Sequence, residues 1–138
     1  METQVIDEQV LISASLEQVW KALTDPEVTV KYWGGTRIES AWKKGAAVLY
    51  RRDGEVVDEH ELREVIPNRL IEHTFRPMFG EFKTEPSSLL TILLSSEANG
   101  TRVQVLHRDF PPSSKVFAAC SEGWPAILGA LKSLLETP

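Results

Sequence analysis

The chain has very little cysteine and no concentration of positive charge. Cys120 is the single cysteine among 138 residues, which excludes an internal disulfide. Lysine and arginine are scattered without a basic run, and the formal net charge is −5. The phosphate attraction on which nucleic-acid-binding proteins rely has no footprint in such a sequence, so we expect no nucleic-acid partner.

Long apolar runs and catalytic motifs are missing as well. No apolar segment approaches the roughly 20 residues that span a bilayer, so we expect no insertion into a membrane. The sequence contains no GxSxG, GxGxxG or GxxxxGKS/T motif, and its histidines show neither HxH nor HExxH spacing. We therefore expect no metal, no cofactor and no nucleophilic catalysis. The first residues, Met-Glu-Thr-Gln-Val, include no basic leader, so the expected location is the cytoplasm.

What is present is the composition of an ordinary globular domain. Hydrophobic residues make up 42% of the chain and charged residues 25%, with no low-complexity tract. A chain of this length can bury a sizeable core without disulfides or metals. We expect one domain that spans residues 1–138.

The first part of the chain predicts a strand followed by two short helices. Residues 4–13 have a strand-like composition. Ser15 is placed as an N-cap and Gln18 can reach back to it, which predicts a helix over residues 15–24. A proline then stops this helix and opens a second one over residues 26–32.

The rest of the chain predicts short strands and one long helix. Asp53-Gly54 and Asn99-Gly100 are typical of tight hairpin turns, so the sheet is expected to be antiparallel. Apolar residues recur at helical spacing over residues 113–135, with Pro125 inside as a source of a bend. The six expected strands are residues 37–42, 46–51, 55–66, 70–75, 89–95 and 101–110.

An antiparallel sheet with one apolar face must bury that face, and only the last helix is long enough to cover it. The predicted fold class is therefore α+β, with a curved sheet that grips a helix. Curvature leaves space between sheet and helix, and concave apolar spaces of this kind are where ligands usually bind.

The order of several segments resembles the activator of heat-shock protein 90 ATPase homologue-like family, within the START-like or Bet v 1-like (SRPBCC) superfamily. The resemblance implies a helix-grip fold, with about seven antiparallel strands around a long C-terminal helix and two short helices after the first strand. It also implies a small hydrophobic ligand between sheet and helix. The segments that carry it are residues 12–27, Trp33-Gly34, Gly54-Glu55-Val56, 63–70, His73-Thr74-Phe75, 90–94, 100–107, Glu122-Gly123-Trp124 and Leu131-Lys132.

Strand alternation suggests which side chains face the predicted cavity. It turns His60, His73 and His107 inward, each either as a polar member of the core or as an acid or base. Glu64 shares the parity of His60, so it is either a functional carboxylate or lies on the other face. Asp58 and Glu59 are expected on a solvated acidic face. The other residues expected on the inner face are Val56, Leu62, Ile66, Ile71, Phe75, Leu90, Ile92, Leu94, Thr101, Val103, Val105 and Asp109.

Aromatic residues gather around the expected mouth and helix face, where ligand contact and core packing are both open. Cys120 has no neighbouring partner that would activate its thiol, so inert burial is expected. The candidate ligand-binding residues are Trp33, Trp42, Tyr50, His60, Glu64, His73, Phe75, Phe79, Ile92, Val105, His107, Phe117, Cys120 and Trp124.

The leading functional hypothesis is a module that binds a small hydrophobic or aromatic molecule. One alternative is an enzyme of the cyclase or dehydratase kind, with His107, His60 or Glu64 as acid or base. Another is a stress-related, co-chaperone-like module that contacts a chaperone through its surface and has a filled interior. The outward parity of Leu93 also suggests that the sheet surface is covered in a homodimer.

Overall fold

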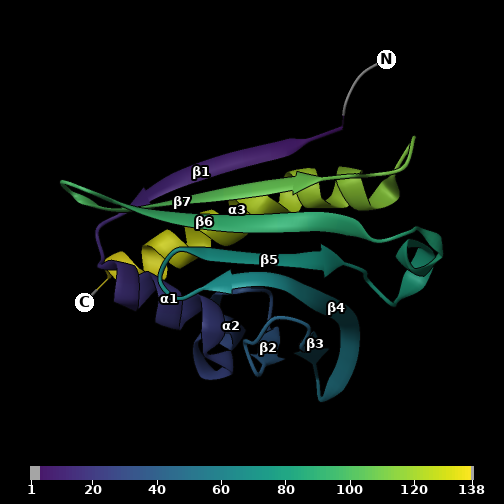
Figure 1. Cartoon of the computed structure of the whole chain (residues 1–138), viewed down its shortest axis with the longest axis horizontal. Coiled ribbons are helices and arrows are strands. Elements are labelled where there is room, and N and C mark those ends of the chain that lie inside the picture. The colour runs from purple at the N-terminus through teal and green to yellow at the C-terminus, as the bar shows by residue number, and fades with distance from the viewer. Residues whose placement is uncertain (1–3, 138) are drawn as a thin grey trace.

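A computed structural model describes residues 4–137, which form a strand, two helices, six strands and a long helix in that order (Figure 1). Every predicted strand and helix is present, with its ends displaced by at most two residues. The elements are β1 (Ile6–Ile12), α1 (Leu16–Thr24), α2 (Pro26–Tyr32), β2 (Arg37–Ser40), β3 (Ala47–Arg52), β4 (Glu55–Ile66), β5 (Leu70–Phe75), the 3-10 helix η1 (Gly80–Thr84), β6 (Ser88–Glu97), β7 (Gly100–Arg108) and α3 (Lys115–Glu136).

The strands form one curved antiparallel sheet in the order β1-β7-β6-β5-β4-β3-β2. Figure 1 shows α3, in yellow, lying along one face of this sheet, while α1 and α2 pack beside the edge strand β2. The apolar side chains of the inner face and of α3 together form the core. This arrangement confirms the predicted α+β helix-grip fold.

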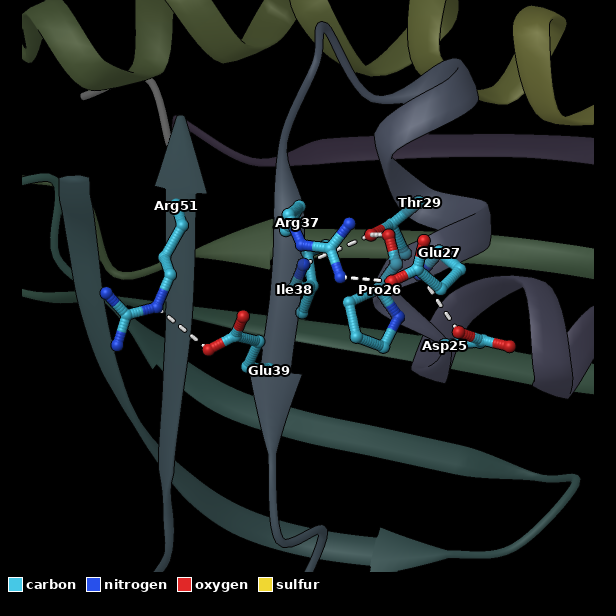
Figure 2. Close-up of polar contacts among 8 residues, drawn as sticks. All are labelled: Asp25, Pro26, Glu27, Thr29, Arg37, Ile38, Glu39 and Arg51. Carbon is cyan, nitrogen blue, oxygen red and sulfur yellow. Dashed lines mark hydrogen bonds and ion pairs between the residues drawn. The ribbon is translucent and has the colours of Figure 1, made fainter. Parts of the chain in front are cut away.

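Two local polar networks explain how α1 and α2 form. The predicted capping box is present, since Ser15 Oγ accepts from the Gln18 N–H at 3.1 Å and Gln18 Oε1 accepts from the Ser15 N–H at 2.8 Å. Asp25 then caps α2 by accepting from the Glu27 N–H at 2.9 Å (Figure 2). Its proline at the first helical position needs no hydrogen-bond acceptor there.

A further set of contacts fixes α2 to the edge of the sheet (Figure 2). Thr29 Oγ1 accepts from the Ile38 N–H at 3.1 Å, and Glu27 pairs with Arg37. Because Thr29 is fully buried, its hydrogen bond holds the end of α2 in one position. Trp33 directly follows α2 and is thereby directed into the interior.

The long helix α3 begins with Ser114 as its N-cap, whose Oγ accepts from the Phe117 N–H at 2.9 Å. Pro125 lies inside the helix, as predicted, and its side chain is exposed. Near the C-terminal end, Lys132 Nζ donates to the Leu11 carbonyl at 2.7 Å and so ties α3 to β1. Within residues 4–137, no helix is both long and apolar enough to cross a membrane.

Strand alternation is correct along β5, β6 and β7. The side chains predicted to face inward are buried there: Ile71, His73, Phe75, Leu90, Ile92, Leu94, Thr101, Val103, Val105 and His107. Asp109 follows β7 and is exposed, so its expected place on the inner face is wrong.

Alternation fails at both ends of β4, where the register shifts. One bulge lies between Leu62 and Glu64, so Glu64 pairs with Glu72 and Ile66 is exposed; their predicted inward orientation is wrong. A second shift, at Tyr50 and Arg51 of β3, puts Val56 opposite Arg51, whose side chain bonds Glu39 away from the core. A β-bulge adds one residue to a strand and thereby exchanges its two faces.

Asp58 is buried, contrary to the prediction from the sequence. We expected it on a solvated acidic face, but its side chain points inward and only 3% of the residue is exposed. It lies directly opposite Tyr50 in the β3–β4 pairing and between the two register shifts. Burial of a carboxyl group is costly unless it is neutral or paired, so its surroundings need explanation.

Gly100 is the glycine at which a side chain would be least tolerated. Its φ is +144°, and a Cβ there would lie 2.0 Å from the carbonyl oxygen of Ile12. We expect Gly100→Ala to lower the free energy of unfolding by more than about 2 kcal/mol, because strand backbone would have to move. Urea denaturation measures this, with Gly54→Ala as the control, since Gly54 has positive φ but open space at its Cβ. Equal costs for the two variants would show that the close approach to β1 is unimportant.

Candidate functional site

A cavity of about 170 Å³ lies between the N-terminal half of α3 and strands β3, β4 and β5. It is roofed by the segment between β5 and η1 and by η1 itself. Its wall is mostly apolar. The lining residues are Trp33, Tyr50, Arg52, Asp58, Phe75, Pro77, Phe79, Phe82, Val116, Ala119, Cys120, Gly123, Trp124 and Ile127.

Aromatic rings form the deep part of the wall. Trp33 packs edge-on against Trp124 and Tyr50, with ring centroids 5.5 and 5.7 Å apart. These side chains come from three parts of the chain: the end of α2, the middle of α3 and β3. Edge-to-face packing of buried rings is favourable and fixes their orientation. The cavity therefore has a rigid aromatic wall.

The polar end of the cavity is built by Tyr50 and Asp58, which are 2% and 3% exposed. Among residues 4–137, no hydrogen-bond partner meets the Tyr50 hydroxyl or Asp58 Oδ1. Burial raises the pKa of the Asp58 carboxyl to about 7 and that of the Tyr50 hydroxyl well above its usual value. Both groups retain hydrogen-bonding capacity at the edge of an apolar space.

His60 lies behind this polar end. Its Nδ1 accepts from the Arg76 N–H at 2.8 Å, so the proton of the neutral ring is on Nε2. Nε2 lies 3.2 Å from Asp58 Oδ2 but is not aligned for a hydrogen bond. Burial lowers the pKa of His60 to about 3 and raises that of Asp58 to about 7, so below pH 7 the two groups form a neutral pair rather than an ion pair.

The other two histidines also have assigned roles in the interior. His73 donates from Nδ1 to the Thr74 carbonyl at 2.7 Å and stacks on His60, with centroids 4.7 Å apart. His107 Nδ1 accepts from the Trp124 indole N–H at 3.1 Å, and its Nε2 lies 2.8 Å from Ser88 Oγ. Burial lowers the pKa of both rings to about 3. Both ring nitrogens of His107 are thus engaged in hydrogen bonds within the protein, which is typical of a structural histidine.

The mouth of the cavity is covered by a segment that is tied to α3. Glu85 accepts from the Ser114 hydroxyl at 2.6 Å and from the Lys115 N–H at 2.7 Å, at the first turn of the helix. Phe79 and Phe82 of the same segment contact each other and line the cavity. The anchored segment therefore holds two aromatic side chains over the mouth.

Residues 13–136 match the family model described as Activator of Hsp90 ATPase homolog 1-like protein. This chain belongs to that family. The resemblance inferred from sequence motifs is thereby confirmed. No match is found among curated proteins.

Solved structures of similar fold agree with the Activator of Hsp90 ATPase homolog 1-like assignment. Protein MLL2253 from Mesorhizobium loti is 22% identical, with a TM-score of 0.81 and 96% of each chain covered. The Aha1 dimer from Colwellia psychrerythraea is 24% identical, with a TM-score of 0.78 and the same coverage. DynU16, from the dynemicin biosynthetic locus, is 21% identical, with a TM-score of 0.81, 99% of this chain covered and 48% of DynU16. At these identities the likeness establishes the fold alone.

Within this family fold, the predicted ligand-binding residues divide into two groups. The residues that line the cavity are Trp33, Tyr50, Phe75, Phe79, Cys120 and Trp124. The residues outside its lining are Trp42, His60, Glu64, His73, Ile92, Val105, His107 and Phe117. Of the second group, Glu64 lies beyond a bulge, whereas the histidines, Ile92 and Val105 are buried in the core. Burial raises the pKa of the Cys120 thiol to about 12, in agreement with an inert side chain.

Sequence reasoning did not identify Asp58, Arg52 or Phe82 as cavity residues. The parity signal for Asp58 was present, because it is two residues before His60, but its residue type favours solvent. Arg52 is the last residue of β3 and follows the register shift, which sequence alternation does not reveal. Phe82 lies in η1, where no strand or helix period applies.

Proposed function

We propose that this chain binds a small, largely hydrophobic molecule between the sheet and α3. The observation that carries the proposal is the apolar cavity of about 170 Å³ with two buried polar atoms, Tyr50 OH and Asp58 Oδ1, that no atom of residues 4–137 satisfies. Buried polar groups without partners are rare in proteins and are often found at functional sites. Both atoms are covered by neighbouring atoms in this structure, so a ligand with one polar end would satisfy them once it displaces those neighbours.

The size of the cavity supports a ligand built around one ring. An engineered apolar cavity of about 150 Å³ binds benzene. The cavity in this chain is similar in volume, and its lining includes the exposed side chain of Phe79, so a substituent could extend outward there. Aromatic side chains in the wall favour an aromatic ligand through edge-to-face contacts.

The enzyme alternative receives less support from the same geometry. The Glu64 carboxyl lies outside the cavity lining, and both ring nitrogens of His107 are engaged by Trp124 and Ser88. His60 is separated from the cavity by Tyr50 and Asp58, which occupy the lining. A general acid or base must reach the proton that it transfers, so we favour binding over catalysis. Contact with a chaperone stays a prediction.

A homodimer also stays a prediction. The Colwellia psychrerythraea relative is a dimer. In this chain, Leu93 of β6 is only half-buried and belongs to the sheet face away from α3. Sedimentation of the wild-type protein and of Leu93→Glu would test whether that face is covered by a second copy.

Two glycines of α3 provide a direct test of the proposed site. Gly123 lines the cavity, and Gly129 does not; a Cβ at either position would meet open space. We expect Gly123→Leu to fill the cavity and to weaken the binding of toluene or indole by more than tenfold. Gly129→Leu should leave binding unchanged, and both variants should fold, because glycine is the poorer helix former. Titration calorimetry measures binding of both probes, because indole has the same fluorescence as Trp33 and Trp124 of the cavity lining.

Native mass spectrometry of gently purified protein would extend the same test to a resident ligand. An additional mass on the wild-type protein and on Gly129→Leu, but not on Gly123→Leu, would place the ligand in the cavity. If the wild type and both variants bind the probes equally, the ligand site is elsewhere and the proposal fails.

A further inference from the structure

We propose that the cavity selects a cationic amine attached to a small aromatic ring, with the ammonium group against Asp58. This inference rests on the proposed function, since it names the ligand class for the same cavity. Its basis is the combination of a buried carboxyl group that has no lysine or arginine at ion-pair distance within residues 4–137 and a wall of aromatic rings.

The Asp58 carboxyl group lacks an ion-pair partner among the lysines and arginines of residues 4–137. Within residues 4–137, no lysine or arginine nitrogen lies within 4.0 Å of the Asp58 carboxyl group, and its ionic neighbour His60 is held neutral by burial. Arg52 also lines the cavity, but its Nε donates to Thr36 Oγ1 at 2.8 Å and its guanidinium carbon lies 5.7 Å from the Phe79 ring centre. A buried carboxylate is stabilised most by a cation with hydrogen-bond donors.

Aromatic side chains make up much of the cavity wall. Trp33, Tyr50, Phe75 and Trp124 all contribute to the lining. The negative face of an aromatic ring attracts a cation, and aromatic cages recognise ammonium groups in this way. The unpartnered Tyr50 hydroxyl offers a second oxygen to an ammonium proton. A neutral hydrocarbon would use the rings but would leave both polar atoms without partners.

Several titratable and charged groups influence the charge of Asp58. Facing it are Arg52 and Tyr50 of β3, His60 of β4, His73 of β5 and Cys120 of α3. Burial raises the Asp58 pKa to about 7, against smaller lowering effects of Arg52 and His73. A bound ammonium favours the ionised carboxyl group and therefore releases a proton near neutral pH. Amine affinity should consequently rise about tenfold between pH 6 and pH 8, as Asp58 ionises.

The experiment compares benzylamine, benzyl alcohol and toluene, which share a ring and differ in the end group. Titration calorimetry at pH 8 should give at least about tenfold tighter binding for benzylamine than for benzyl alcohol, because hydrogen bonds to charged groups are the stronger ones. Benzylamine is protonated throughout the range from pH 6 to pH 8, so any pH dependence of its binding reports the ionisation of Asp58. The binding of benzyl alcohol and toluene should not depend on pH. Two buffers of different ionisation enthalpy would reveal the released proton.

Asp58→Asn is the decisive variant, and Asp53→Asn is its matched control. Asp53 lies in the exposed turn between β3 and β4 and does not line the cavity. We expect Asp58→Asn to remove the preference for benzylamine over benzyl alcohol and its pH dependence. Asp53→Asn should retain both. Tyr50→Phe, which removes the hydroxyl and keeps the ring, should weaken benzylamine binding without abolishing the preference.

The outcomes separate this inference from the proposed function. If toluene and benzyl alcohol bind but benzylamine binds no tighter, the cavity is a ligand site and the amine inference is wrong. A benzylamine preference that persists in Asp58→Asn would also overturn the inference, because another group would then carry it. If none of the three compounds binds the wild-type protein, both proposals fail together.

Discussion

Replacement of Trp124 by alanine should lower the free energy of unfolding by roughly 3–5 kcal/mol. Trp124 is 3% exposed and joins the cavity wall to the core of the sheet. Its ring packs against Trp33 and Phe75, with centroids 5.5 and 6.4 Å apart. Its indole N–H donates to His107 at 3.1 Å. The substitution therefore removes a large buried surface and leaves a buried imidazole nitrogen without a donor.

Trp124→Phe separates these two effects. Phenylalanine keeps most of the ring packing but cannot donate to His107 Nδ1, so we expect about 1–3 kcal/mol of destabilisation. Urea denaturation followed by circular dichroism measures both variants. Trp42→Ala provides a comparison, because Trp42 is only half-buried and outside the cavity lining. A loss below about 1 kcal/mol for Trp124→Ala would mean that the residue lines empty space and is not part of the core.

The architecture was predictable because its signals are local. The capping pair Ser15 and Gln18 marks the start of α1, and Asp53-Gly54 marks a two-residue hairpin in which both residues have positive φ. The helical spacing of apolar residues predicted where α3 begins and ends, to within two residues. These signals depend on neighbouring residues along the chain, so tertiary contacts do not change them.

The candidate site was only partly predictable because it depends on sheet curvature. Alternation holds along β5 and β7, so His73 and His107 were placed correctly. It fails at the two register shifts of β4, where Glu64 and Val56 change face. Bulges respond to the bending of the sheet around α3, which no short stretch of sequence encodes. Asp58 lies between the shifts, so its parity was correct and only the expectation from its residue type was wrong.

Acid unfolding at mildly low pH is the other large effect that we expect. All three histidines of the chain are buried, and burial lowers the pKa of each to about 3. An unfolded histidine has a pKa near 6.5. As the pH falls below 6.5, the unfolded chain therefore takes up protons that the folded protein does not. Stability is retained above this pH and is lost progressively as the pH falls toward 3.

Asp58 acts in the opposite direction. Its folded pKa of about 7 exceeds its ordinary value of 3.8, so the folded state holds a proton that the unfolded state has lost between these pH values. Its contribution is present at low pH and disappears as the pH rises through 7. Near pH 5.5, the unfolded state should bind about two more protons than the folded state, three from histidines less one from Asp58. The net loss between pH 6.5 and pH 4.5 is then on the order of 4 kcal/mol, a large part of the stability of a typical domain.

Urea denaturation at intervals between pH 7.5 and pH 4.5 would give this proton difference from the slope of unfolding free energy against pH. Asp58→Asn should steepen the slope near pH 5.5 toward three protons, because only the opposing group is removed. His73→Phe should make it shallower by about one proton, since phenylalanine can keep the stack on His60 without titrating. A wild-type slope near zero over this range would mean that the buried histidines are protonated in the folded protein, in contradiction to the hydrogen bonds that His60 Nδ1 and His107 Nδ1 accept.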